Sequence, residues 1–173
     1  MAQRSVLLLV LAWLGPDATV TLHAKQPGEL IERTLAIVGG QVITLSDVQA
    51  ATRFGLVQQQ GGPNELGVTT EALIDRALML REVQRYSPPE PLEAEVARRL
   101  TDIRNRFSGD DEFARALDAV GLNEQRLESW VRDDLRITSY LNQRFADERR
   151  AALIADWIAD LRRRTPVVHL WKQ

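Results

Sequence analysis

One segment of the sequence is apolar around most of the circumference of a helix. Thr69 and Thr70 open this segment, and the apolar residues that follow are Leu73, Ile74, Ala77, Leu78, Met79 and Leu80. At the 3.6-residue repeat of an α-helix these side chains point in most directions. Such a helix is stable in water only when other elements cover it. The sequence therefore predicts a helical domain with this helix buried at its centre.

Apolar stripes predict further helices before and after this central one. They fall over about 45–60, from Leu92 to Phe107, over 113–120, from Asn123 to Phe145 and over 153–161. Each stripe repeats every three or four residues, as on a helix with one face turned to a core. Thr44 and Asp47 are spaced as a capping box for the first of these helices. Asn123 is placed to cap the long one.

Short β-like segments lie at both ends of this helical region. Residues 35–38 and 41–44 are rich in β-branched and apolar residues, and Gly39-Gly40 separates them. Two-residue hairpin turns need positive φ, so the glycine pair predicts a hairpin. Residues 167–170 form a third β-like segment that can pair with the hairpin. The predicted fold class is mainly α, with a small antiparallel sheet formed by the N-terminal hairpin and the C-terminal strand.

The N-terminus has the order of a secretory signal peptide. Arg4 supplies a positive charge, the apolar run 5–14 follows, and Gly15-Pro16 breaks it. The run is too short for a membrane span, which takes about 20 residues. A buried N-terminal helix is the alternative interpretation. We expect cleavage near Leu22-His23-Ala24, export to the periplasm and no stable membrane span after cleavage.

The domain organisation follows from these signals. Residues 1–24 are expected to be the signal peptide and 25–31 a linker, since Lys25-Gln26-Pro27-Gly28 is typical of one. Residues 32–173 are expected to form a single domain. Within it, an N-terminal core over 32–146 is closed by the C-terminal helix and strand over 147–173.

Composition and charge exclude several kinds of function. The chain has 22 Lys and Arg against 24 Asp and Glu, a formal net charge of -2, so it lacks the basic surplus that nucleic-acid binding needs. It has no cysteine and two histidines, His23 and His169. A lone histidine in a β-like segment is more often a structural residue than a ligand or a base. We therefore expect no metal site, no catalytic residues and no cofactor.

Paired charges have structural interpretations. Asp110-Asp111 precedes a helix, where carboxylates complement the helix dipole. Asp133-Asp134 lies among arginines at helical spacing, which favours surface ion pairs. The basic runs Arg98-Arg99 and 162–164 are interpreted as a solvated face and a complement to the C-terminal end of a helix dipole.

Apolar and aromatic residues beside the predicted core stripes are candidates for binding extended polypeptide. Phe54 and Val57 lie off the stripe of the first helix, and Tyr140 lies off the stripe of the long one. Met79 and Tyr86, on the central helix, complete the set of candidate peptide-binding residues. Flat amphipathic side chains offer contact area at a low entropy cost. The alternative is that neighbouring helices cover these side chains.

Several of these segments resemble one known family. The stretch 37–48, with Ile43-Thr44 followed by Asp47, resembles the start of the SurA-type periplasmic chaperone domain. The stretches 72–78 and 127–145 are similar to the central and later helices of that family, and 158–170 is similar to its closing helix and strand. The helical part is shared more loosely with trigger-factor-like chaperones. The resemblance implies a periplasmic, ATP-independent holdase for unfolded or extended segments of envelope and outer-membrane proteins.

The chain departs from this family at one point. Family members usually insert a parvulin peptidyl-prolyl isomerase domain between the long helix and the closing helix. Here seven residues, 146–152, separate Phe145 from Leu153, and no parvulin domain fits there. We therefore expect no isomerase activity. The alternatives are an isomerase family member by ancestry alone, or a periplasmic assembly subunit that docks one dedicated partner.

Overall fold

The structure is a computed structural model that describes residues 32–57, 64–146 and 148–171. Every described residue lies in one compact unit of the chain, Ile31–Gln173. The predictions of a signal peptide over 1–24 and of a linker over 25–31 concern residues outside the described part.

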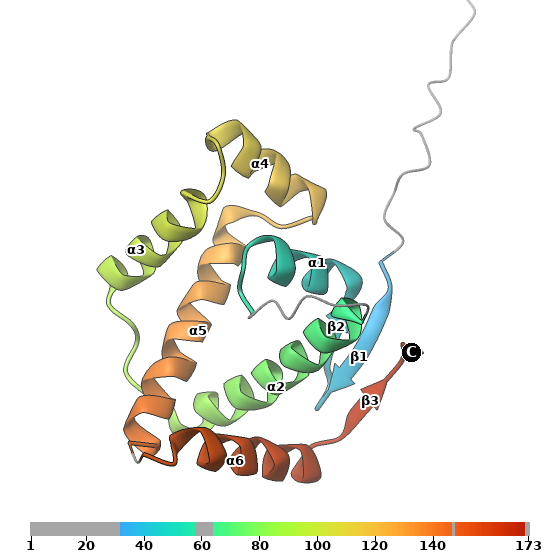
Figure 1. Ribbon diagram of the computed structural model, residues 1–173, viewed down its shortest axis with the longest axis vertical. Coiled ribbons are helices and arrows are strands. Elements are labelled where there is room, and N and C mark those ends of the chain that lie inside the picture. Colours follow the sequence, from blue (N-terminus) through green and yellow to red (C-terminus); the bar gives the residue numbers. More distant parts are fainter. Residues whose placement is uncertain (1–31, 58–63, 147, 172–173) are drawn as a thin grey trace, which may run out of the picture. The chain divides into compact units, whose positions relative to one another are not determined.

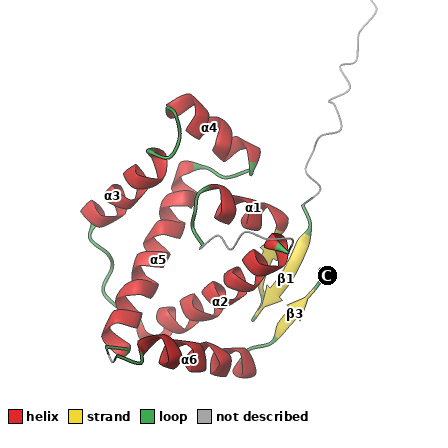
Figure 2. Ribbon diagram, viewed as in Figure 1, coloured by secondary structure: helices red, strands yellow, loops and turns green. Residues whose placement is uncertain are grey.

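The described part is mainly helical, as the sequence predicts, with one small antiparallel sheet (Figures 1 and 2). In chain order its elements are β1 (Thr34–Val38), β2 (Gln41–Thr44), α1 (Leu45–Arg53), α2 (Glu65–Tyr86), α3 (Glu93–Arg104), α4 (Asp110–Ala119), α5 (Glu124–Arg144), α6 (Arg150–Arg164) and β3 (Val167–His169).

The sheet joins the two ends of this domain. Its strand order is β2-β1-β3, and both pairings are antiparallel. Gly39 and Gly40 turn the hairpin with φ of +53° and +94°, a region that favours glycine. Ala36 lies opposite His169, and Val38 opposite Val167. The predicted pairing of the C-terminal strand with the hairpin is confirmed.

Helix α1 begins at the predicted capping box and ends earlier than predicted. The Thr44 hydroxyl accepts a hydrogen bond from the Asp47 N–H at 3.2 Å, and Asp47 Oδ2 accepts one from the Thr44 N–H at 2.9 Å. The helix stops at Arg53 because Gly55 adopts φ +58°. Arg106 Nη1 donates to the Phe54 carbonyl at 3.1 Å and holds this helix end against the chain that follows α3.

Helix α2 begins at Glu65, about one turn before the predicted start at Thr69. Thr69 and Thr70 are buried inside the helix and do not cap it. The Thr70 hydroxyl donates to the Leu66 carbonyl at 2.7 Å, so the helix itself satisfies its polar group.

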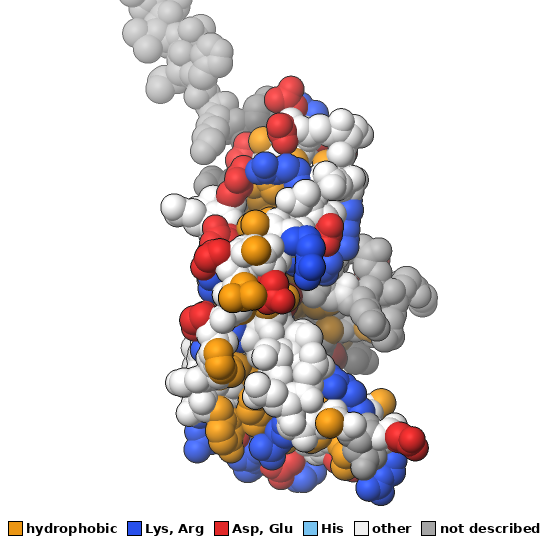
Figure 3. Space-filling model, turned by 90° about the vertical axis from the view of Figure 1, so that its left-hand side faces the viewer, with side chains coloured by type: hydrophobic (Ala, Val, Ile, Leu, Met, Phe, Trp, Pro, Cys, Tyr) orange, Lys and Arg blue, Asp and Glu red, His pale blue; other side chains and the backbone are white. Residues whose placement is uncertain are grey.

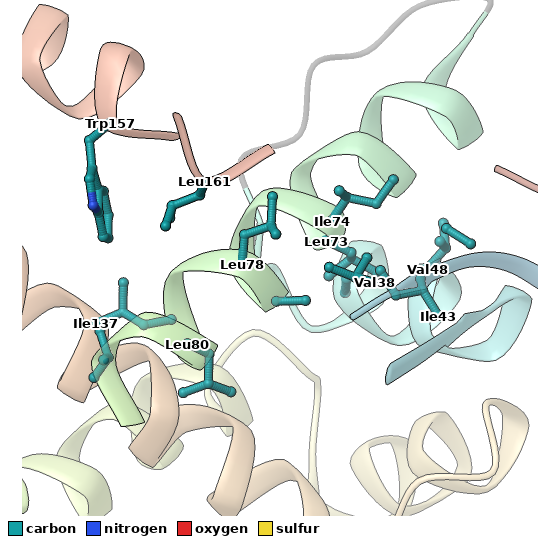
Figure 4. Packing of buried hydrophobic residues seen from close by; sticks show 14 of the residues in the cluster. Val38, Ile43, Val48, Leu73, Ile74, Leu78, Leu80, Ile137, Trp157 and Leu161 are labelled. Atoms are coloured by element: carbon teal, nitrogen blue, oxygen red, sulfur yellow. The ribbon is translucent and has the colours of Figure 1, made fainter. Parts of the chain in front are cut away.

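The central position of α2 is confirmed by the packing around it. Leu73, Ile74, Leu78 and Leu80 are at most 6% exposed. The sheet, α1, α5 and α6 contribute the residues that cover them, including Val38, Ile43, Val48, Ile137, Trp157 and Leu161 (Figure 4). Elements from both ends of the domain therefore share one core.

A second, smaller core joins α3 and α4 to α5 and to the end of α1. Its centre is three phenylalanine rings: Phe54 lies 5.6 Å from Phe107 and 6.0 Å from Phe113, between ring centroids. Val96 and Ile103 of α3 are buried against this core, as the predicted stripe requires.

Arg162 ties α6 to α2. Its guanidinium contacts Asp75 at 2.6 Å and Glu71 at 2.7 Å. Glu71 also lies 3.3 Å from the His169 imidazole in β3. One carboxylate of α2 is thus adjacent to both the last helix and the last strand.

None of the described helices has a stretch that is both long enough and apolar enough to cross a membrane.

We predict that Trp157→Ala destabilises the domain by about 3–5 kcal/mol, the usual cost of deleting a buried aromatic side chain. Trp157 is 8% exposed, and its ring packs 5.7 Å from Tyr140 and 5.6 Å from Phe145. Asp156→Ala, at the exposed neighbouring position of α6, is the control and should change stability by less than about 0.5 kcal/mol. Urea unfolding followed by circular dichroism measures both. Equal effects of the two substitutions would contradict the proposed closure of the core by α6.

Candidate functional site

Two of the predicted peptide-binding residues are buried in the core. Phe54 is 0% exposed because Phe107 and Phe113 pack around it. Tyr140 is 7% exposed, between Tyr86 and Trp157. The prediction that Phe54 and Tyr140 lie on a binding surface is therefore wrong in this fold, because neighbouring helices cover both rings.

Tyr86 is exposed, and its ring packs against the buried Tyr140. It is the last residue of α2, is 58% exposed, and its ring lies 5.5 Å from that of Tyr140. Leu92, at the start of α3, is 69% exposed. On the side of the molecule where α3 lies, Figure 3 shows hydrophobic atoms in small separate groups among charged ones. This face presents no single continuous apolar patch.

Val57 and Met79 lie together in a cleft of about 770 Å³. The walls are formed by α2, α5, one residue each of α3 and α6, and the chain after α1. The described residues that line the cleft are Leu56, Val57, Val68, Glu71, Ala72, Asp75, Arg76, Met79, Arg99, Val131, Asp134, Leu135, Ile137, Thr138 and Ile158. Most of them are apolar, and the five charged ones, called the charged margin below, are Glu71, Asp75, Arg76, Arg99 and Asp134.

The cleft lies where the two cores meet. Val57, Met79, Ile137 and Ile158 belong to the core around α2, or pack against it. Val131 and Leu135 belong to the core around Phe54, or pack against it. Residues of both cores thus line one space, which neither core fills.

An ion pair between α2 and α5 lies among the charged residues of the cleft. Arg76 of α2 donates from Nε to Asp134 of α5 at 2.7 Å and from Nη2 to the Trp130 carbonyl at 3.1 Å. Its guanidinium also lies over the Trp130 ring, 4.9 Å from the centroid. Asp133 lies 3.9 Å away. The predicted partners of this acidic pair were arginines of the same helix, but the shortest contact comes from α2.

Burial has the largest effect on the pKa values of Asp133 and Asp134. It raises the pKa of Asp134 above the ordinary value, and the nearby Arg76 guanidinium offsets only part of this effect. Burial likewise raises the pKa of Asp133, against the opposing charges of Arg76 and Arg136. Partial burial of these two carboxylates therefore raises their pKa values more than the neighbouring arginines lower them.

The geometry of the cleft suits non-covalent binding. Its apolar walls can cover side chains, and the exposed Thr138 and Arg99 at its margin can hydrogen-bond to a peptide backbone. Within residues 32–57, 64–146 and 148–171, no three His, Asp or Glu side chains are grouped so as to hold a metal ion.

Sequence reasoning missed most of the lining residues. Leu135 had a signal that could have identified it, since it is apolar and lies beside the stripe that α5 turns to the core. Ile158 was assigned to the core stripe of its helix, and the structure leaves it partly exposed to the cleft. Leu56 has no comparable signal, because it follows a helix whose early end was not predicted.

No family model matches the chain, and no curated protein matches it either.

We predict that the stability contributed by Asp134 falls as the pH rises. Its pKa is raised in the folded state, so the folded protein binds its proton more tightly than the unfolded chain does. The free energy of unfolding, compared with that of Asp134→Asn, should therefore decrease as the pH rises from the ordinary aspartate pKa of 3.8 through the raised value. Urea unfolding at a series of pH values measures this difference.

Asp102→Asn on the exposed face of α3 is the control for the loss of one negative charge. If the difference between the parent and Asp134→Asn rose with pH instead, the pKa of Asp134 would be lowered, and the account of its burial would be wrong.

Proposed function

We propose that this protein is an exported, ATP-independent holdase, which binds extended apolar segments of unfolded polypeptides in the cleft between α2 and α5. The observation that carries the proposal is the open apolar cleft of about 770 Å³, lined by residues of both cores. Ligand pockets in proteins span roughly 300–1,000 Å³. The space suits a few side chains of a client rather than a folded domain.

The energetics of such a cleft favour weak and reversible binding. Covering one aliphatic side chain contributes about 1.5–3 kcal/mol. A client must also lose conformational freedom when it binds, which offsets much of this gain. A cleft that accepts two or three side chains would hold a client without trapping it, as a holdase requires.

The charged residues at the margin make few demands on client sequence. Arg76 and Asp134 are bonded to each other, and Asp75 and Glu71 to Arg162. Charged side chains that are already paired with each other gain little binding energy from a particular client side chain. Recognition would then rest on apolar area and on backbone hydrogen bonds, which most unfolded chains offer.

The location and the clients are part of the same proposal. The order of Arg4, the apolar run 5–14 and Gly15-Pro16 supports export to the periplasm. The resemblance of 37–48 and 127–145 to the SurA-type chaperones supports envelope and outer-membrane proteins as clients. The short connection between the end of α5 at Arg144 and the start of α6 at Arg150 supports a chaperone without a parvulin domain.

We predict that Met79→Lys lowers the affinity for an unfolded client about tenfold, because a charge enters the apolar wall of the cleft, and one tenfold step is about 1.4 kcal/mol. Gln84→Lys, at an exposed position of the same helix, adds the same charge outside the cleft and should bind as the parent does. Met79→Leu keeps an apolar side chain and should also bind. Light scattering of an aggregating outer-membrane protein, with increasing amounts of the mature chaperone, measures the effect.

Three results would contradict the proposal. The first is a parent protein that never delays aggregation of the client. The second is an equal loss of activity in Met79→Lys and Gln84→Lys. The third is a pull-down that yields one folded partner in fixed stoichiometry, which would indicate an assembly subunit. Acceleration of a proline-peptide isomerisation assay above background would favour the isomerase alternative.

A further inference from the structure

Strand β3 is an edge of the sheet, and its hydrogen bonds to β1 show which backbone groups point outward. The Gly39 N–H donates to the Pro166 carbonyl at 2.9 Å, and the Leu170 N–H donates to the Leu35 carbonyl at 2.8 Å. Residues of an antiparallel pair alternate between facing the partner and facing away from it. The backbone N–H and C=O of Val168, midway between these two bonds, also point toward β1.

The backbone groups of Val167 and His169 therefore point away from β1. Strand β3 is the last in the order β2-β1-β3, and no strand of the described chain pairs with its outer side. In Figure 1, β3 lies at the outer margin of the sheet. The outer edge thus presents an N–H and a C=O from each of two residues, in the spacing of a β-ladder.

A row of apolar side chains crosses the solvent face of the sheet and ends at this edge. Ile37 lies opposite Val42 on one side and Val168 on the other, so the three side chains share one face. Val42 and Val168 are each 48% exposed, and Leu170 is 50% exposed. Of the six large hydrophobic residues exposed in the described part of the chain, these three lie in the sheet or next to it.

The two edges of the sheet differ in their protection. Side chains of Asp47, Arg126 and Trp130 line a small pocket together with β2, so helices flank that edge. Natural edge strands are guarded by a short length, by lysine or proline, or by a bulge. Strand β3 is short and follows Pro166, but its three residues include no lysine, proline or bulge.

We infer that the outer edge of β3 accepts an extended segment of a client polypeptide as a fourth strand. The bonds would run between the backbone groups of Val167 and His169 and those of the client, in the manner of β-strand addition. Client side chains on the face of Val168 would continue the row of Val42 and Ile37. This inference rests on the proposed holdase function and specifies its substrate class: segments that alternate β-branched or other apolar residues with polar ones.

The length of the edge favours a transient client over a second copy of the chain. Strand β3 has three residues, of which two present backbone groups outward. A two-fold pairing of β3 with itself would fall well short of the roughly 1,200 Å² that stable interfaces bury. A foreign segment needs no stable complex, because a holdase must release what it binds.

The first test measures exchange of the backbone amides in the mature protein by NMR. The probe is a short synthetic peptide that alternates valine and threonine between terminal lysines. Its control is the same peptide with an N-methyl group on every residue, which removes the N–H donors of both edges. We expect the amides of Val167 and His169 to exchange more slowly when the first peptide is added and to be unaffected by the second. The amides of Val168 and Leu170, bonded to β1 already, serve as internal references.

The second test compares His169→Pro with His169→Ala. Both substitutions remove the imidazole and its contact with Glu71. Only proline also removes the outward N–H, and it leaves the bonds of Val168 and Leu170 to β1 in place. We expect His169→Pro to bind the peptide at least about fivefold more weakly than His169→Ala, from the loss of one hydrogen bond and the obstruction by the ring. The amide-exchange test on the parent protein stands even where His169→Pro does not fold.

The outcomes separate this inference from the proposed function. The inference is overturned if the protein suppresses client aggregation while the amides of Val167 and His169 stay unprotected and the two variants bind the peptide equally. The cleft then remains the binding site. If the protein neither suppresses aggregation nor shows amide protection, the inference and the proposed holdase function are both overturned. Protection of the same amides that appears with rising protein concentration and no peptide identifies a second copy as the occupant, and also overturns the inference.

Discussion

The burial of α2 on several sides is the constraint on which the rest of the fold depends. Its apolar residues leave no broad face that water can solvate, so the sheet, α1, α5 and α6 all pack against it. Covering one helix from so many directions requires elements from both ends of the domain. The pairing of β3 with β1 and the contact of Arg162 with Asp75 hold those late elements in place.

The candidate cleft lies between two separate hydrophobic cores. Helices α3 and α4 build their own core on Phe54 and Phe113 instead of adding to the core around α2. Helix α5 serves both cores, and the space between them stays open beside Met79 and Leu135. The ion pair of Arg76 and Asp134 lies among the residues that line the cleft, and partial burial raises the pKa of its carboxylate.

The two proposed binding surfaces complement each other chemically. The cleft offers apolar area to side chains, whereas the edge of β3 offers donors and acceptors to a backbone. Unfolded polypeptides expose both kinds of group, and neither surface needs a particular sequence. A chaperone that uses both would favour apolar segments of high β-propensity, the kind that aggregates most readily.

Much of the fold could be predicted from local patterns. The Gly39-Gly40 turn, the capping box of Thr44 and the central place of α2 depend on residues close together in the sequence, and all three are confirmed. The binding residues could not be predicted in the same way. Phe54 and Tyr140 have the same local signature as Val57, an apolar side chain beside a core stripe. Only the packing of distant helices decided that the first two are buried and that Val57 lines a cleft, because exposure depends on neighbours that the local sequence does not specify.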